Sequence, residues 1–131
     1  MTQAVPTFSQ IAAQLTAPGQ MFETERVRIR GVDVTSWKNA PPTLRHIFEG
    51  SRRFADRTYL VYAGESLSFD EHYRRVVALA NALVTDLGLR KGDRVALAMR
   101  NYPEWSIAFW AIAATGAVAH LLHFVGGQFV D

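Results

Sequence analysis

Hydrophobic and polar residues alternate along this chain with two periods, one typical of helices and one typical of strands. The strongest helical stripe covers residues 69–87, where apolar side chains recur every three or four positions and the opposite side is charged. Ser68 and Glu71 have the spacing of a capping box, and Gly88 provides a left-handed stop after the stripe. The pattern therefore predicts a long amphipathic helix with well-marked ends.

Three other segments have helical spacing. The first covers residues 6–15, and the second runs from Thr43, a favourable N-cap, to about Ala55. The third begins at Pro103, whose fixed φ suits the first turn of a helix, and stops at Gly116. In the second helix the apolar spacing predicts four inward-facing side chains, namely Leu44, Ile47, Phe48 and Phe54.

A strand period marks residues 21–30 and 32–37, which Gly31 divides. This arrangement predicts a β-hairpin. One face of its first strand carries three arginines, Arg26, Arg28 and Arg30. An anion-binding patch is one interpretation of them, but a solvated strand face is favoured, because alternation requires one polar side.

The remaining apolar runs predict further strands. Residues 58–63 and 66–68 flank a Gly64-Glu65 turn and predict an antiparallel pair. Residues 94–99 are apolar on both faces, which is typical of a central parallel strand, and another strand begins at Ala117. The predicted fold class is α/β: a partial three-layer β/α unit with a short parallel sheet, plus the N-terminal β-hairpin.

Composition narrows the possible classes. With 131 residues, of which 49% are hydrophobic, the chain is expected to form a single domain over residues 1–131. A net charge of +2 does not favour nucleic-acid binding, and the lack of cysteine excludes disulfides and thiol nucleophiles. Residues 1–16 lack the pattern of a secretory signal, so a cytoplasmic location is expected.

Residues 105–125 contain no Asp, Glu, Lys or Arg and are long enough to span a bilayer. Gly116, His120 and His123 interrupt this segment, and a buried helix followed by a buried strand has the same composition. Membrane association is therefore not favoured. A small membrane-associated protein that uses residues 105–125 remains an alternative.

No nucleotide or nucleophile motif is complete. The strand-to-helix turn at residues 100–103 has no glycine, and Gly126-Gly127 has too little chain after it to form a helix. Residues 64–68 resemble a nucleophile elbow but have Ser68 in place of its last glycine. The serines are better explained by a turn and a helix cap.

The histidines do not predict a reactive site either. His120 and His123 have the spacing of two metal ligands on a helix, but a third protein ligand is missing. His46 and His72 are expected on helix surfaces or partly buried, because neither lies beside a glycine turn, and the carboxylate pair next to His72, Asp70-Glu71, is explained by the first turn of a helix. We therefore predict no catalytic, cofactor-binding or metal-binding residue.

Five segments, in order, resemble the AMP-forming acyl-CoA synthetases of the adenylate-forming, AMP-binding superfamily, and most of all the bacterial fatty-acid-CoA ligases. They are residues 37–44, 67–71, 92–96, 100–104 and 116–118, and the resemblance extends from about Leu15 to Ala119. It implies a reaction of lipid metabolism in which a carboxylate is joined to AMP from ATP with magnesium. The acyl group then passes to the thiol of coenzyme A.

In that family the phosphate loop, the adenosine-binding motifs and the catalytic lysine lie downstream of this region. We therefore expect a truncated N-terminal part of the large adenylating domain, inactive alone and with no site for ATP, Mg or CoA. Residues 120–131 depart from the family pattern, which suggests a frameshift or a premature stop. In an alternative function, the fragment is an interaction module that pairs with a separately encoded ligase remainder or a paralogue.

Overall fold

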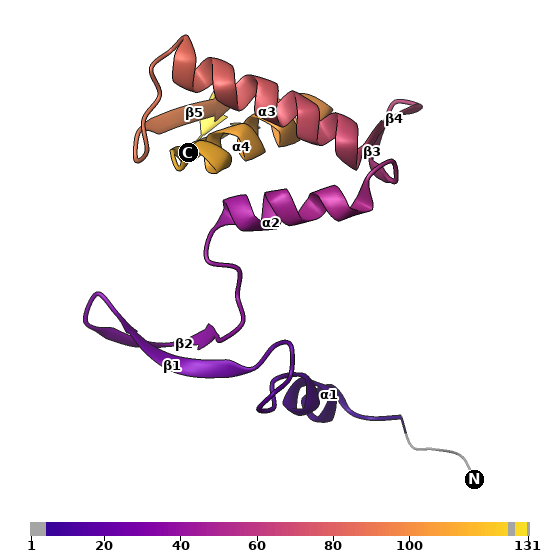
Figure 1. Ribbon diagram of the computed structural model, residues 1–131, viewed down its shortest axis with the longest axis vertical. Helices are drawn as coiled ribbons and strands as arrows, with labels where there is room; N and C mark the ends of the chain where they lie inside the picture. The colour runs from indigo at the N-terminus through magenta and orange to yellow at the C-terminus, as the bar shows by residue number, and fades with distance from the viewer. Residues whose placement is uncertain (1–4, 126–127, 131) are drawn as a thin grey trace. The chain divides into compact units, whose positions relative to one another are not determined.

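The computed structural model describes the backbone of residues 5–125 and 128–130, with side chains as far as residue 122 (Figure 1). The chain divides into two compact units, Met1–Pro41 and Pro42–Asp131. We call these the first unit and the second unit and describe each by itself. The assignment of residues 1–131 to one domain stays a prediction.

The first unit contains helix α1 (Phe8–Leu15) and a hairpin of β1 (Thr24–Ile29) and β2 (Val32–Trp37). The strands pair antiparallel, as predicted, with Val27 opposite Val34. Arg30 and Gly31 connect them with φ angles of 48° and 85°, and a type I′ turn requires positive φ at both central positions. Arg30 therefore belongs to the turn, so the prediction that it shares a strand face with the other two arginines is wrong.

Within the described residues, the second unit contains three α-helices, one 3-10 helix and the strands from β3 onward. Its elements are α2 (Leu44–Gly50), the 3-10 helix η1 (Ser51–Phe54), β3 (Thr58–Tyr62), β4 (Glu65–Ser68), α3 (Phe69–Thr85), β5 (Arg94–Ala98), α4 (Pro103–Thr115), β6 (Val118–Val125) and β7 (Gln128–Val130). Ser68 caps α3, and Gly116 ends α4 with a φ of 79°, as the sequence indicates. The predicted elements of this unit are thus confirmed, except that the helix predicted from Thr43 to about Ala55 ends as α2 at Gly50 and is followed by the 3-10 helix η1.

The strands of the second unit form two small sheets. β3 and β4 form an antiparallel pair, and β5 pairs with β6 in parallel, with α4 as the connection between β5 and β6. β7 then pairs with β6 antiparallel. The predicted mixed α/β class is confirmed. The sequence predicts a central position for β5, however, and within the described strands it lies at the edge of the order β5-β6-β7.

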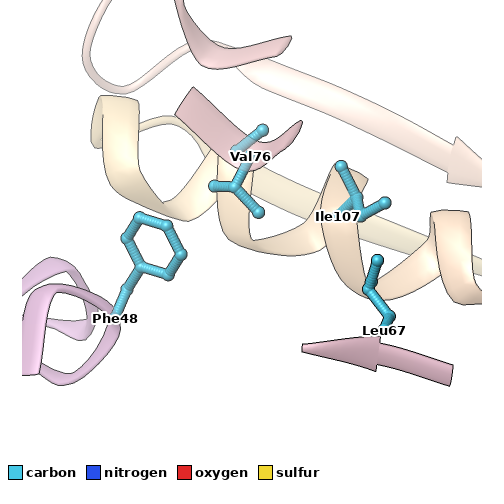
Figure 2. Close-up of a cluster of buried hydrophobic side chains, with 5 residues drawn as sticks. Phe48, Leu67, Val76 and Ile107 are labelled. Atoms are coloured by element: carbon cyan, nitrogen blue, oxygen red, sulfur yellow. The ribbon is translucent and has the colours of Figure 1, made fainter. Parts of the chain in front are cut away.

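The core of the second unit lies where α2, β4, α3 and α4 meet. Figure 2 shows Phe48 directed toward Val76 and Leu67 toward Ile107, and Ala111 completes the buried cluster. Val76 is fully buried. Burying a side chain of this size contributes about 1.5–3 kcal/mol to the free energy of unfolding. This cluster holds the helices and the β3–β4 hairpin together.

The predicted inward face of α2 is only partly correct. Phe48 is buried, with its ring stacked on those of Tyr73 and Trp110 at centroid distances of 4.9 and 5.8 Å. Leu44 and Ile47, in contrast, are exposed. α2 has only about two turns, and the single aromatic ring of Phe48 fills the side that faces α3 and α4.

The apolar segment of residues 105–125 is divided by Gly116 between α4 and β6. Within the described residues, none of the helices combines the length and the hydropathy that a transmembrane helix needs.

Candidate functional site

The turn from β5 to α4 is the place where a phosphate loop would be expected. Two of its backbone amides are engaged: Tyr102 N donates to Arg100 O at 2.8 Å, and Trp105 N donates to Tyr102 O at 3.0 Å. Pro103 has no amide hydrogen. These three positions therefore offer no donor to a phosphate group. The Gly126-Gly127 pair, which the sequence analysis considered as a phosphate-binding turn, lies outside the described residues.

Ser68 and Glu71 serve the start of α3. The Ser68 side chain accepts from Glu71 N at 3.2 Å, while the Glu71 carboxylate accepts from Ser68 N at 3.0 Å and from Ser68 Oγ at 3.1 Å. The backbone hydrogen bond from Ser68, supported by the one from its hydroxyl, lowers the pKa of Glu71. A carboxylate held ionised by a capping box is a poor general acid, so these residues are structural.

The two arginines that remain on strand β1 have partners across the hairpin. Arg26 Nη1 donates to Thr35 Oγ1 at 3.1 Å, and Arg28 lies 3.5 Å from Asp33 Oδ1. Each arginine is therefore opposite its partner in the register of β1 and β2. This arrangement supports the solvated strand face over an anion-binding patch, because an anion site needs cations that converge on one point.

His46 is exposed on α2, where its Nδ1 lies 2.7 Å from the hydroxyl of Thr43. His120 and His123 belong to strand β6 and not to a helix, so the helical spacing of metal ligands does not apply to them. Among the residues that the structure describes, no group of three or more metal-ligating side chains comes together.

His72 differs from the prediction. It is only 2% exposed, although its place in the sequence predicts a surface or partly buried position. The sequence did carry a signal for this burial: His72 lies four residues before the fully buried Val76 and three after Phe69, within the apolar stripe of α3. A histidine on an apolar stripe has to find a hydrogen-bond partner in the interior.

The partner of His72 is Ser106 on α4, whose Oγ lies 3.2 Å from His72 Nε2. Ser106 Oγ also lies 2.9 Å from the hydroxyl of Tyr59 on β3. The rings of Tyr59 and His72 approach to a centroid distance of 4.2 Å. These three side chains form what we call the Tyr59–Ser106–His72 chain. It joins three elements that are distant in the sequence.

The Tyr59–Ser106–His72 chain contains a serine and a histidine in hydrogen-bond contact, as a nucleophile and its base would be. Burial lowers the pKa of His72, and a hydrogen bond with the backbone of Ser106 partly offsets this effect. In a catalytic triad the third member is a carboxylate that orients the imidazole. Here the third member is the phenol of Tyr59, and it contacts Ser106. His72 is also closed to solvent. The chain is therefore a packing feature and lacks the access that a substrate requires.

A groove of about 380 Å³ lies between α2, α3 and α4. Its lining is mixed, with apolar side chains beside polar ones and an Arg45–Glu49 ion pair of 2.7 Å among them. The side chains that line it are Arg45, Phe48, Glu49, Tyr73, Val77, Ala80, Asn81, Val84, Ala114 and Thr115. The Arg45 guanidinium lowers the pKa of Glu49, so both groups remain charged and satisfy each other. Because Arg45 and Glu49 neutralise each other, this ion pair gives the groove no net charge that would select a charged ligand.

Comparison with known proteins gives the context for these features. The AMP-binding family, described as AMP-binding enzyme, matches residues 47–124, from α2 to β6. A long-chain-fatty-acid–CoA ligase of Salmonella typhimurium is 38% identical over 77 residues, which cover 58% of this chain and 14% of the relative. An acetyl-coenzyme A synthetase of the same species is 39% identical over 99 residues, or 66% of this chain and 14% of the relative. The chain thus spans about a seventh of the length of these curated relatives.

A solved structure agrees with this relationship. The N-terminal subdomain of Klebsiella oxytoca NpsA, in complex with anthranilyl-AMSN, superposes with a TM-score of 0.58 at 30% identity. The superposition covers 66% of this chain and 22% of that one. The family match coincides with the α2-to-β6 part of the fold, more than half of the sequence. The chain therefore belongs to the AMP-binding enzyme family.

Proposed function

We propose that this chain is the N-terminal scaffold of an adenylating domain of the acyl-CoA ligase type. In the proposed parent enzyme, a fatty acid reacts with ATP and magnesium to form an acyl adenylate, and the acyl group then passes to coenzyme A. The similarity to a fatty-acid–CoA ligase over 77 residues supports this assignment. The match to acetyl-coenzyme A synthetase leaves the length of the acyl substrate open to experiment.

We further propose that the 131-residue polypeptide has no adenylation activity by itself. This proposal is carried by one observation: within the described residues, the candidate polar groups are already hydrogen-bonded to other parts of the chain. Glu71 and Ser68 cap α3, His72 and Ser106 are joined to each other, and Tyr102 N and Trp105 N are bonded within the β5–α4 turn. Polar groups that are committed in this way are not directed at a nucleotide.

The test is an ATP–pyrophosphate exchange assay with the purified chain, magnesium and a panel of acids from acetate to long-chain fatty acids. We expect exchange at background for every acid. A full-length ligase of the family, assayed in parallel, serves as the positive control. Exchange that depends on an added acid and increases with the concentration of the chain would overturn this part of the proposal.

A second candidate function is that of an interaction module for a separate ligase polypeptide or a paralogue. It is favoured by two surfaces of the second unit: the edge of β5, which has no second strand partner within the described residues, and an exposed apolar set. That set comprises Leu44, Ile47, Val61, Val84, Leu87 and Val118. An open strand edge and exposed apolar residues are features that protein partners cover.

This candidate predicts that the chain co-purifies with a family ligase that lacks the region equivalent to residues 47–124. The intact ligase, whose own copy of the region occupies the same place, is the matched control and should not retain the chain. A monodisperse monomer that binds neither form would count against an interaction role.

A further inference from the structure

The Tyr59–Ser106–His72 chain lies at the junction of β3, α4 and α3. Tyr59 is the only member from the β3–β4 hairpin, and its hydroxyl reaches Ser106 on α4 at 2.9 Å. Ser106 in turn reaches His72 on α3 at 3.2 Å. The described side chains thus provide a polar connection from the hairpin to both long helices of the second unit.

The immediate surroundings of the imidazole are uncharged. His72 contacts the rings of Phe48 on α2 and Tyr59 on β3, together with the hydroxyl of Ser106. Of these groups, only Tyr59 is titratable, and a tyrosine is neutral near pH 7. A positive charge at this position would therefore be desolvated without a carboxylate among these contacts to balance it.

Several charged side chains on the neighbouring elements have partners other than His72. On α3, Glu71 belongs to the capping box with Ser68, and on α2, Glu49 pairs with Arg45. On η1 and the loop that follows it, the guanidinium groups lie over aromatic rings: Arg52 over Tyr73, and Arg53 and Arg57 over Phe54. Glu65 of β4, Arg75 of α3 and Glu104 of α4 line a separate hollow of about 80 Å³.

Protonation would also disturb the hydrogen bonds. A neutral imidazole can accept a hydrogen bond at Nε2 from the Ser106 hydroxyl, which can then accept one from Tyr59. A protonated imidazole is a donor at both nitrogens, so Ser106 Oγ has to accept from His72. The Ser106 hydroxyl then loses His72 as its acceptor while the charge remains buried.

We propose that Tyr59, Ser106 and His72 form an acid-sensitive latch, in which protonation of His72 releases the β3–β4 hairpin from α4. The latch is closed when His72 is neutral and opens when acid gives the imidazole a charge that its pocket cannot hold. This property is independent of whether the chain takes part in adenylation.

The direction of the pH dependence follows from the burial of His72. Burial lowers the pKa of His72 below the ordinary histidine value of 6.5. The released state, in which the imidazole is hydrated, therefore takes up a proton at higher pH than the latched state. Latching is complete above pH 6.5 and weakens as the pH falls below it, with a limiting slope of about tenfold in the opening constant for each pH unit.

Hydrogen exchange followed by mass spectrometry on the full chain tests the latch, with rates corrected for the intrinsic effect of pH. Between about pH 6.5 and 5.5 we expect the opening constant of the β3 and β4 amides to rise by up to about fivefold in the wild type. His72→Gln keeps a neutral hydrogen-bonding side chain and should abolish this rise. His46→Gln changes an exposed histidine on α2 and should leave the rise unchanged.

Two further measurements keep the proposal falsifiable if His72→Gln does not fold. In the wild type, the NMR signals of the His72 ring should titrate at a lower pH than those of a free histidine. Tyr59→Phe, which removes one hydroxyl and keeps the ring, should increase hairpin opening at about pH 7.5, where His72 is neutral. A His72 midpoint at or above the free value, hairpin exchange that does not respond to acid, or a His46→Gln effect equal to that of His72→Gln would overturn the latch.

Discussion

The two units of this chain differ in what holds them together. The second unit has a buried cluster built around Phe48, Val76 and Ile107, to which helices and a strand contribute. In the first unit, none of the described residues is buried, and α1 leaves Phe8 85% exposed. The first unit nevertheless forms a capped helix and a hairpin with a regular register.

This difference shows that secondary structure and stability have separate origins. The hairpin of the first unit is specified by alternation and by a turn with two positive φ angles, both of which act over a few residues. An isolated two-stranded hairpin is at best marginally stable in water. Cooperative stability is therefore expected to depend on the second unit, which also contains the region matched by the AMP-binding family.

The largest expected difference in the free energy of unfolding is between two phenylalanine substitutions, one in each unit. Phe48→Ala removes a ring that is 4% exposed and stacked between Tyr73 and Trp110, and we expect a loss of about 3–5 kcal/mol in the free energy of unfolding. Phe8→Ala, at 85% exposure, should cost less than about 0.5 kcal/mol. Urea denaturation followed by far-UV circular dichroism measures both. Equal losses would contradict the distinction between the two units.

Two glycines with positive φ, one in each unit, allow the same comparison for the backbone conformation of turns. Gly116 ends α4 with a φ of 79°, and a Cβ there would lie 3.1 Å from Lys91 Cγ. Gly116→Ala should cost about 1–2 kcal/mol, because alanine tolerates positive φ poorly. Gly31, in the hairpin of the first unit, has a φ of 85°, but a Cβ added there would have no neighbouring atom within 4 Å. Gly31→Ala should have a smaller effect. Thermal unfolding of both variants measures the two losses, and a larger loss for Gly31→Ala would reverse our ranking of the two turns.

The two capping boxes form a third matched pair. Ser68 caps α3 and Thr7 caps α1, each with the reciprocal hydrogen bonds of the motif. Ser68→Ala should cost about 1 kcal/mol, because α3 carries part of the core. Thr7→Ala should cost less, since α1 buries none of its residues. Midpoints of chemical unfolding provide the measurement, and a greater loss for Thr7→Ala would show that α1 contributes more than its exposure indicates.

The smallest expected effect is on the pH dependence of stability, and it comes from Glu71, the carboxylate of the α3 capping box. Hydrogen bonds from Ser68 lower the pKa of Glu71 below its ordinary value of 4.5. The folded pKa is therefore the lower one, so the stabilisation is present above pH 4.5 and is lost as the pH falls below it. Glu71→Gln should flatten the pH dependence of stability between about pH 5 and 3, as measured by urea denaturation at each pH. Gln10, the equivalent residue in α1, is neutral, so Gln10→Ala should leave the slope as it is.

Local signals predicted most of the elements. The cap at Ser68, the first-turn proline at Pro103 and the stop at Gly116 all act within one helical turn, and each lies where the sequence indicated. The errors concern features that depend on distant residues. Whether Ile47 faces a neighbour depends on how α2 meets α3 and α4, and whether β5 is central depends on which strands flank it.

The Tyr59–Ser106–His72 chain shows the same limit within the candidate site. Tyr59 is separated from Ser106 by 47 positions, and His72 from Ser106 by 34. The spacing of His72 and Val76 could have indicated that the imidazole is buried. No pattern in the sequence selects Ser106 as its partner, because that contact exists only when α3 and α4 pack together.

The sequence by itself predicted most of the helices and strands, and it identified the AMP-binding family, since caps, turns and short motifs depend on residues close together in the chain. The tertiary structure alone decided which apolar and polar side chains are buried. Burial depends on the packing of α2, α3, α4 and the β3–β4 hairpin around one core, and that packing brings together residues that are far apart in sequence.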